Sequence, residues 1–257
     1  MIFVGTFGQA RIPEIATVAT PINLSVIKAF DTLDLFSVDR PEVTADIVAR
    51  ELGMTYPTAH RFLTTLEAAD IVSATRRGAF APGPRLARLG RMAEDLAPVP
   101  PNLQETLDGL STALNESVMA CRYTPRGPLC VAVSAADRPI SVNIRTGTTL
   151  PMLATAQGRL WLSAMTPAKR AAWAQAQGVT PAEMDAISGV LNAIAAQGHA
   201  LNQGDNEPDI AALSVPVSID GHMGLTMSVF GMLSRFDAAL LGRAEKLLKD
   251  AAKTLAH

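Results

Sequence analysis

Polar side chains with hydrogen-bonding capacity gather in one short segment, residues 55–61. They supply hydroxyls, an aromatic ring and a guanidinium group: Thr55, Tyr56, Thr58 and Arg61, with Pro57 and His60 between them. Threonine hydroxyls bond to phosphate oxygens, and an arginine can bind the O6 and N7 atoms of guanine through two parallel hydrogen bonds. This segment therefore offers the chemistry of a nucleic-acid contact. A solvated polar helix face is the alternative interpretation.

Apolar spacing predicts the elements that position this segment. A helix over 56–69 buries one stripe at i, i+3, i+4 and i+7 spacing, formed by Ala59, Phe62, Leu63 and Leu66. Before it, Thr44 caps a helix carrying Ile47, Val48 and Leu52 and closed by Gly53, and Ser25 caps an earlier helix carrying Val26, Phe30 and Leu33. After it, strands at 71–74 and 79–82 flank a hairpin tip with Arg76 and Arg77. This is the element order of a winged helix-turn-helix.

Charge is distributed unevenly along the chain. In total, 22 Lys and Arg against 24 Asp and Glu give a formal net charge of −2, which argues against nonselective coating of polyanions. Residues 60–91 contain six arginines and only two acidic residues, so this stretch has a net charge of +4. The other residues together have a net charge of −6. The arginines are Arg61, Arg76, Arg77, Arg85, Arg88 and Arg91. This basic strip coincides with the predicted helix-turn-helix, where the hairpin arginines would meet phosphates or a minor groove.

A proline-rich patch at residues 98–101 ends the preceding helix and marks a domain boundary. That helix covers 84–96, and its apolar residues follow the heptad spacing of a dimer seam: Leu86, Leu89, Ala93 and Leu96. A helix face packed on a core is the alternative for the same spacing.

Beyond the prolines, strands and helices group as in an α+β sheet domain. A helix over 102–115 precedes strands at 117–123, 129–134 and 140–144, of which the first two form a hairpin. Helices follow at 156–165, 167–177 and 181–197, and a long polar loop covers 198–209. Strands at 210–218 and 224–230 and a helix at 236–255 complete the domain.

Three stretches of the sequence resemble the IclR family of bacterial transcriptional regulators. Residues 45–67, ADIVARELGMTYPTAHRFLTTLE, resemble the family's DNA-binding head, and residues 80–90, FAPGPRLARLG, resemble its wing exit and linker. Residues 147–159, GTTLPMLATAQGR, are similar to its effector-domain loop and helix start. The resemblance implies an N-terminal winged helix-turn-helix, a linker helix and a C-terminal GAF-like antiparallel-sheet effector domain, assembled as a homodimer or a dimer of dimers.

The same resemblance implies where an effector binds: on the sheet face, at the helix start after Pro151 and on the loop before the penultimate strand. The matched residues are Ala156, Gln157, Asn202, Ala212, Ser228 and Phe230, with Leu150 and Met152 as apolar wall and Met119 and Cys121 lining the same cavity. The effector implied is a small organic acid, with aromatic acids among the candidates. Backbone N–H groups at the helix N-terminus, residues 155–158, suit a carboxylate.

Two departures from the family pattern bear on the effector. Arg159 stands where family members commonly have lysine, and Asp209-Ile210-Ala211 replaces an arginine-containing strand start. The second change predicts a more apolar pocket than that of sensors for small oxoacids. Arg122 and Arg145 are candidate charge partners for the acid.

No pattern for metal binding or nucleophilic catalysis is found in the sequence. Cys121 and Cys130 are interpreted as buried thiols of a reduced, cytoplasmic protein, and the four histidines lack zinc spacing. We therefore expect no catalytic residues, no metal, no cofactor and no membrane partner. The alternatives to a regulator are a dimeric metabolite-binding module without DNA function and an enzyme of the α+β class.

Together these patterns predict four segments and one function. Residues 1–21 form a disordered tail, 22–83 the DNA-binding domain, 84–98 the linker helix and 99–257 the effector-binding and oligomerisation domain. Thr44 joins segment 55–61 and the two hairpin arginines as a predicted DNA contact. The predicted protein is a repressor or an activator that binds double-stranded operator DNA and responds to a small organic acid.

Overall fold

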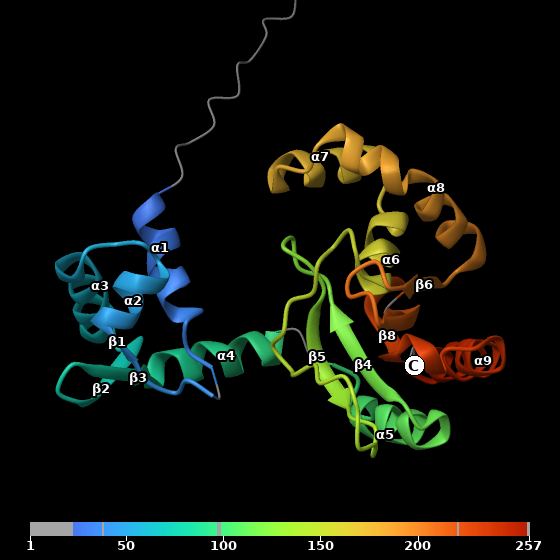
Figure 1. The fold of residues 1–257 in the computed structure, drawn as a ribbon, viewed down its shortest axis with the longest axis horizontal. Helices are drawn as coiled ribbons and strands as arrows, with labels where there is room; N and C mark the ends of the chain where they lie inside the picture. Colours follow the sequence, from blue (N-terminus) through green and yellow to red (C-terminus); the bar gives the residue numbers. More distant parts are fainter. Residues whose placement is uncertain (1–22, 38, 97–98, 220, 256–257) are drawn as a thin grey trace, which may run out of the picture. The chain divides into compact units, whose positions relative to one another are not determined.

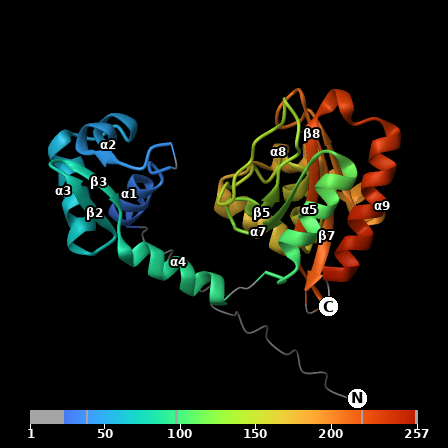
Figure 2. The same cartoon turned by 90° about the horizontal axis from the view of Figure 1, so that it is seen from below.

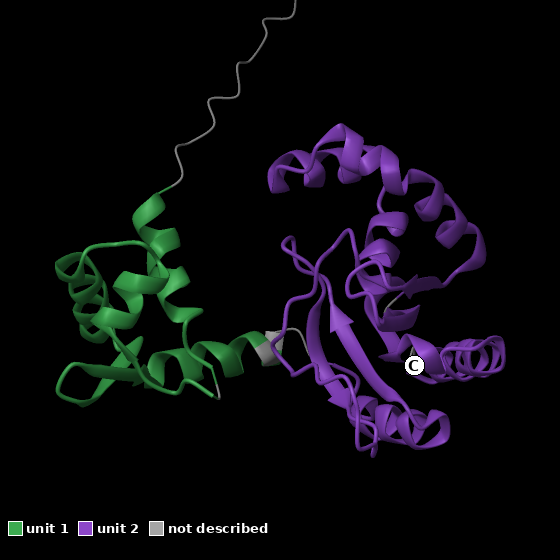
Figure 3. Ribbon diagram, viewed as in Figure 1, with its two compact units in different colours: residues 1–98 green, residues 99–257 purple. Residues whose placement is uncertain are grey.

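The computed structural model describes residues 23–37, 39–96, 99–219 and 221–255, so the tail expected over 1–21 lies outside the described residues. The chain divides into two compact units, residues 1–98 and 99–257, which Figure 3 colours green and purple. Each unit has an apolar core of its own.

The first unit consists of short helices around a small antiparallel sheet (Figure 1). Its described elements are α1 (Leu24–Leu33), β1 (Val43–Thr44), α2 (Ala45–Glu51), α3 (Tyr56–Ala68), β2 (Val72–Arg76), β3 (Ala79–Pro82) and α4 (Pro84–Leu96). β3 lies between β1 and β2, and the core beneath them includes Val48, Leu63 and Phe80. The predicted winged helix-turn-helix is therefore confirmed, with β1 as an additional two-residue strand that the sequence pattern did not indicate.

Local sequence explains the turn between α2 and α3. The Thr44 hydroxyl accepts a hydrogen bond from the Ile47 backbone N–H at 3.4 Å, which caps α2 as predicted. Gly53 follows α2 with a φ of +61°, a left-handed conformation that glycine adopts without steric cost. The chain then reverses and enters α3, whose Ala59 and Leu63 are fully buried.

The prediction for α1 was wrong in its cap and in its buried face. The side chain of Asn23, rather than Ser25, caps the helix by accepting hydrogen bonds from the backbone N–H groups of Ser25 and Val26. Val26 and Phe30 are exposed, whereas Leu33 packs against the core. Asn is as good a cap as Ser, so the spacing of apolar residues alone could not choose between them.

The second unit is a five-stranded antiparallel sheet flanked by helices. Its described elements are α5 (Leu103–Leu114), β4 (Ser117–Arg122), β5 (Leu129–Ser134), α6 (Ala156–Ala164), α7 (Pro167–Gln177), α8 (Pro181–Gln197), β6 (Ala200–Gln203), β7 (Ile210–Ile219), β8 (His222–Met232), the short 3-10 helix η1 (Leu233–Arg235) and α9 (Ala238–Leu255). The strand order is β5-β4-β8-β7-β6. The predicted antiparallel-sheet domain with mixed helices is confirmed.

Strand alternation divides the interior of this unit between two faces of the sheet. Val118 and Ala120 of β4 pack with α5 and α9, which Figure 2 shows on one side of the sheet. Met119 and Cys121 of the same strand point to the other face and pack with α6 and α8. The second face carries the residues predicted to line the effector site.

Two segments of this unit were predicted wrongly. Residues 140–144 form no strand, because β5 instead exchanges backbone hydrogen bonds with residues 147–150. The polar stretch 198–209 is not a continuous loop, because residues 200–203 form β6 along β7. Asn202 therefore lies on an edge strand, where pairing with Ala212 of β7 fixes the backbone on either side of it.

Glu116, at the start of β4, forms a buried ionic contact at one end of the sheet. Its carboxylate accepts hydrogen bonds from Arg235 at 2.5 and 2.8 Å and lies 3.4 Å from an Arg138 nitrogen. Hydrogen bonding to Glu116 raises the pKa of Arg235 above its usual value.

Among the described helices, none is long and apolar enough to cross a bilayer.

Candidate DNA interface and effector site

The start of α3 exposes the polar residues that the sequence singled out. Thr55 occupies the N-cap position without a side-chain capping bond; its hydroxyl instead lies 2.9 Å from that of Thr58. Pro57 sits in the first turn, where its missing N–H removes no helical hydrogen bond. The other N–H groups of this turn have no side-chain cap and can bond to an anion such as a phosphate.

One face of α3 presents an aromatic pair and an arginine. The rings of Tyr56 and His60 stack with their centroids 6.2 Å apart, and half of the Tyr56 surface is exposed. Arg61 is also exposed, and no acceptor for its guanidinium group occurs among the described residues. Arg61 borders a groove between α1 and α3 that also includes Val26 and Thr65. The helix therefore holds a cation free to bind an external group.

The two hairpin arginines differ in their surroundings. Arg76, at the end of β2, donates hydrogen bonds from Nε and Nη2 to one Glu42 oxygen at 3.1 and 3.0 Å. The other Glu42 oxygen accepts a hydrogen bond from the Thr75 hydroxyl at 2.7 Å. These bonds from Thr75 and Arg76 lower the pKa of Glu42. Arg77, at the hairpin tip, has no such partner in the described part of the chain.

Thr44 lies below this surface rather than on it. It is half-buried, caps α2 and pairs with Ala79 of β3. Six of the predicted DNA contacts thus occupy the exposed or half-exposed start of α3, and two occupy the hairpin. Thr44 itself holds the turn that orients α3.

Seven of the ten predicted effector residues lie together on the sheet face opposite α5 and α9. Six belong to one apolar cluster, which also includes Cys130 and Leu160: Met119, Cys121, Leu150, Ala156, Ala212 and Phe230. Ser228 lies on the same face of β8 as Phe230 and is fully buried. The residues come from β4, β7, β8, α6 and the segment 147–150, so the fold brings together positions that are more than 100 residues apart.

Polar groups in this region are few and mostly satisfied. The hydroxyls of Ser214 and Ser228 lie 2.5 Å apart across β7 and β8. The Asn202 amide donates to the Ala154 carbonyl and accepts a hydrogen bond from the Asp205 N–H at 3.0 Å. Gln157 differs from them, because it is almost fully buried and its Nε2 has no hydrogen-bond partner in the described part of the chain. Such a donor is rare in protein interiors and is available to a ligand.

Met152 lies in a different cluster, together with Trp161 and Trp173.

Gly158 explains why the segment before α6 packs so closely against the first turn of that helix. A Cβ atom at Gly158 would lie 2.1 Å from the Met152 carbonyl oxygen, so only glycine fits. Thr155 completes this turn by capping α6, accepting a hydrogen bond from the Gly158 N–H and donating one to the Pro151 carbonyl.

Sequence reasoning missed the role of Arg159 and the partner of Cys121. Arg159 is buried, donates to the Leu153 carbonyl at 2.8 Å and forms an ion pair with Asp205. It thereby ties the start of α6 to the segment after β6, a contact 46 residues apart in the chain. Cys130 faces Cys121 across β5 and β4, and a hydrogen bond between the two thiols together with burial raises the pKa of Cys121.

The two arginines considered as charge partners occupy the margin of the unit. Arg122 is half-buried at the end of β4, and Arg145 is exposed in the segment before residue 147. Both interact with other groups of the protein.

Among the described residues, no group of three or more metal-binding side chains occurs.

A winged helix-turn-helix followed by an antiparallel-sheet domain with a partly apolar sheet face is the architecture of a ligand-responsive DNA-binding regulator. Comparison with known proteins gives the particular family. The family model for the "Bacterial transcriptional regulator IclR C-terminal" domain matches residues 97–257, and the "IclR helix-turn-helix domain" matches residues 25–75. The chain belongs to the IclR family of transcriptional regulators, with a DNA-binding domain and a C-terminal effector domain.

Individual relatives agree with this assignment. The chain is 24% identical to the HTH-type transcriptional regulator XynR of Escherichia coli over 245 residues, which cover 92% of this chain and 97% of XynR. It is similar in fold to an IclR transcriptional regulator from Alicyclobacillus acidocaldarius, with a TM-score of 0.71, 23% identity, and coverage of 92% and 98% of the two chains. An IclR homologue from Microbacterium hydrocarbonoxydans, complexed with 4-hydroxybenzoate, has a TM-score of 0.71 at 20% identity, with coverage of 90% and 97%.

Proposed function

We propose that this protein binds operator DNA through the start of α3 and the β2–β3 hairpin, and that a small organic acid on the sheet face of the second unit controls this binding. The observation that carries the DNA site is the exposed start of α3, where Arg61 has no acceptor for its guanidinium group among residues 23–37, 39–96, 99–219 and 221–255. A guanidinium group there can bind a guanine edge, and Arg77 can bind a phosphate. Thr55, Tyr56, Pro57, Thr58 and His60 complete the proposed contact surface.

The buried Gln157 Nε2 supports the effector site. An amide donor without a partner, next to an apolar cluster at the start of α6, suits a carboxylate whose ring or chain lies against apolar side chains. The N-terminus of α6 favours the same charge. The complex of a similar regulator with 4-hydroxybenzoate makes aromatic acids the first class to test.

We assign a separate function to each part of the chain. Residues 22–83 bind DNA, 84–98 form a linker helix that pairs with a second copy, and 99–257 bind the effector and contribute to oligomerisation. The proposed assembly is a homodimer or a dimer of dimers in the cytoplasm. A coupling free energy between the two sites then changes operator affinity when the acid binds.

The first experiment tests the DNA site with Arg61→Ala. We expect binding to a specific fragment of the gene's own upstream DNA to weaken by about 1–3 kcal/mol, because a bidentate arginine–guanine contact is lost. Arg126→Ala removes an equal charge from an exposed position of the second unit and serves as the control. Equal binding by both variants and the original protein in a gel-shift titration would remove Arg61 from the interface.

The second experiment tests the effector site with Gln157→Leu. Thermal-shift titrations with hydroxybenzoates, dihydroxybenzoates and small oxoacids should stabilise the original protein but not this variant, because the proposed donor is gone. The variant should fold at least as well, since it removes a buried donor without a partner. Gln177→Leu, at an exposed position of α7, is the control. An unchanged ligand-induced shift in Gln157→Leu would contradict the proposed contact.

A further inference from the structure

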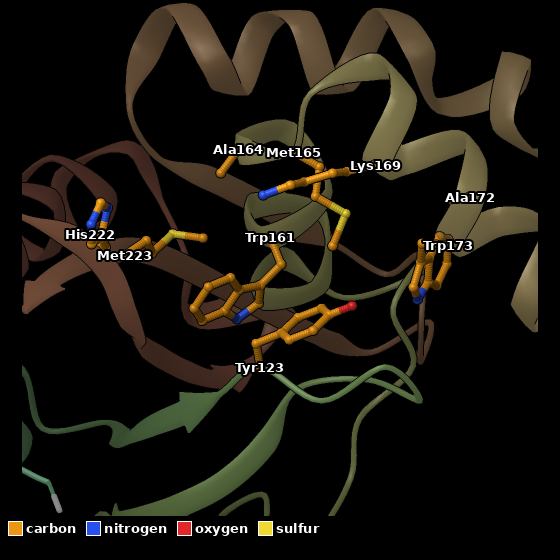
Figure 4. A pocket seen from close by; sticks show the side chains of 9 residues that line it. All are labelled: Tyr123, Trp161, Ala164, Met165, Lys169, Ala172, Trp173, His222 and Met223. Carbon is orange, nitrogen blue, oxygen red and sulfur yellow. The ribbon is translucent and has the colours of Figure 1, made fainter. Parts of the chain in front are cut away.

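A cavity lies beside α6 and α7 in the effector domain, and no residue of the sheet-face cluster lines it. It has a volume of about 610 Å³, which is within the range of small-molecule sites. Its lining comes from α6, α7 and the ends of β4 and β8: Tyr123, Trp161, Ala164, Met165, Lys169, Ala172, Trp173, His222 and Met223. Figure 4 shows how these side chains surround it.

Helix α6 contributes to both this cavity and the proposed effector site. Leu160 belongs to the apolar cluster on the sheet face, whereas its neighbour Trp161 belongs to the cluster that lines the cavity. None of the residues proposed to contact the effector is among the nine that line this space. The two linings therefore share no residue, although Gln157 stands one helical turn before Trp161 on α6.

The cavity wall is aromatic and sulfur-rich. The rings of Tyr123 and Trp161 lie side by side with centroids 5.5 Å apart and an angle of 54° between their planes (Figure 4). Two methionines also line the space, and thioether sulfurs pack favourably against aromatic rings. Such a wall favours a flat, apolar ring over an aliphatic or strongly polar molecule.

Trp161 and Lys169 supply donors at this cavity that have no acceptor among the described residues. Trp161 Nε1 is buried and lacks such a partner, whereas Trp173 Nε1 donates to the Pro125 carbonyl at 2.7 Å. The Lys169 ammonium group has no hydrogen-bond or ion-pair partner within the described residues. None of the nine lining residues is acidic, so the lysine charge is not neutralised within the wall.

We propose that this cavity binds an aromatic carboxylate, with the ring against Tyr123 and Trp161 and the carboxylate near Lys169. A planar ring fills the apolar wall, an acid oxygen accepts from the free donors, and the cation balances the negative charge. This site is additional to the effector site on the sheet face and does not depend on it.

Intrinsic fluorescence tests the site directly, because both tryptophans of the chain line the cavity. The probes are 4-nitrobenzoate, which carries a carboxylate and quenches tryptophan emission, and the uncharged 4-nitrobenzamide. We expect saturable quenching by both, with tighter binding of the carboxylate. Lys169→Gln should weaken binding of the carboxylate about fivefold and leave the amide unchanged, the size expected when one exposed ion pair is lost.

Three variants make the result decisive. Lys246→Gln makes the same substitution at an exposed lysine of α9 and should not change quenching. Trp161→Phe keeps an aromatic ring and removes the free N–H donor, so quenching of Trp173 should require more of either probe. Gln157→Leu should leave quenching intact, because it alters only the proposed effector site.

Quenching that rises linearly without saturation, or equal affinity for the carboxylate in Lys169→Gln and the original protein, would overturn the second site. A thermal shift by hydroxybenzoates that depends on Gln157, together with such linear quenching, would support the sheet-face site alone. Saturable, Lys169-dependent quenching without any Gln157-dependent shift would support the second site and contradict the proposed effector contact.

Discussion

At the residue scale, Glu42 controls how much cationic charge the hairpin presents. Its carboxylate holds the Arg76 guanidinium group through two hydrogen bonds and accepts a third from Thr75. Because these bonds lower its pKa, Glu42 remains ionised at neutral pH. Of the two hairpin arginines, Arg77 is then the one without a carboxylate partner among the described residues. DNA must either compete with Glu42 for Arg76 or bind without it.

Glu42→Gln should therefore strengthen DNA binding. Loss of the carboxylate releases Arg76 to bind a phosphate, so the slope of log K against log salt concentration should steepen by about 1. Titration of a fixed operator fragment at several salt concentrations measures both effects.

Glu51→Gln is the matched control, because Glu51 also pairs with an exposed arginine, Arg50, on the same unit. An identical slope for Glu42→Gln and the original protein would mean that Arg76 stays outside the interface even when it is released.

Sequence reasoning identified the cationic residues but not their pairing. Arg76 and Arg77 are neighbours with the same charge, and nothing local distinguishes them. The difference arises from Glu42, which lies 34 residues before Arg76 and reaches it only because the hairpin folds back. The same holds for Arg159 and Asp205, so long-range ion pairs were the part of the sites that local spacing could not predict.

At the element scale, apolar periodicity succeeded where an element carries a complete stripe. α4, α7 and α8 have the predicted bounds, and the four leucines of α5 are buried: Leu103, Leu107, Leu110 and Leu114. It failed for 140–144, where β-branched residues suggested a strand but the neighbouring hydrogen-bonding edge of β5 was occupied by 147–150. Strand formation depends on an available partner, which composition does not reveal.

The close packing of α6 against the segment before it gives a prediction. Gly158→Ala should destabilise the protein by about 1–3 kcal/mol, because the added methyl would collide with the Met152 carbonyl and shift the chain around residues 152–155. The same shift should reduce stabilisation by any acid bound at the start of α6. Urea unfolding followed by tryptophan fluorescence measures the change, since Trp161 lies on α6.

Gly189→Ala provides the opposite expectation within the same unit. Gly189 lies inside α8, and a Cβ atom there would meet nothing within 4 Å. Alanine should stabilise the helix by about 0.5–1 kcal/mol. If both glycine variants were stabilised alike, close packing at Gly158 would not constrain the α6 entrance.

At the scale of the whole molecule, the net charge of −2 combines a basic strip and an acidic remainder. The strip from His60 to Arg91 belongs to the first unit, which carries −5 outside the strip, from 4 Lys and Arg against 9 Asp and Glu. Residues 99–257 carry only −1, from 12 Lys and Arg against 13 Asp and Glu. Positive charge is therefore concentrated locally within the first unit, and this favours selective contact with DNA at the strip over general attraction to polyanions. Operator recognition by such a chain also requires two copies if the operator has two half-sites.

The exposed apolar residues of α4 provide the last prediction, that this helix pairs two copies. Leu89 and Met92 are 36% and 47% exposed, and Leu86, Leu89 and Ala93 keep heptad spacing. Leu89→Glu would place like charges across the seam, so the mass measured by light scattering at micromolar concentration should fall from dimer toward monomer. Operator affinity should fall with it, because two linked DNA-binding domains bind two half-sites more tightly than separate domains do.

Ala87→Glu adds the same charge to an exposed position of α4 outside the heptad stripe and should leave the mass unchanged. An unchanged mass for Leu89→Glu would show that the copies assemble elsewhere, and the apolar stripe would then need another explanation.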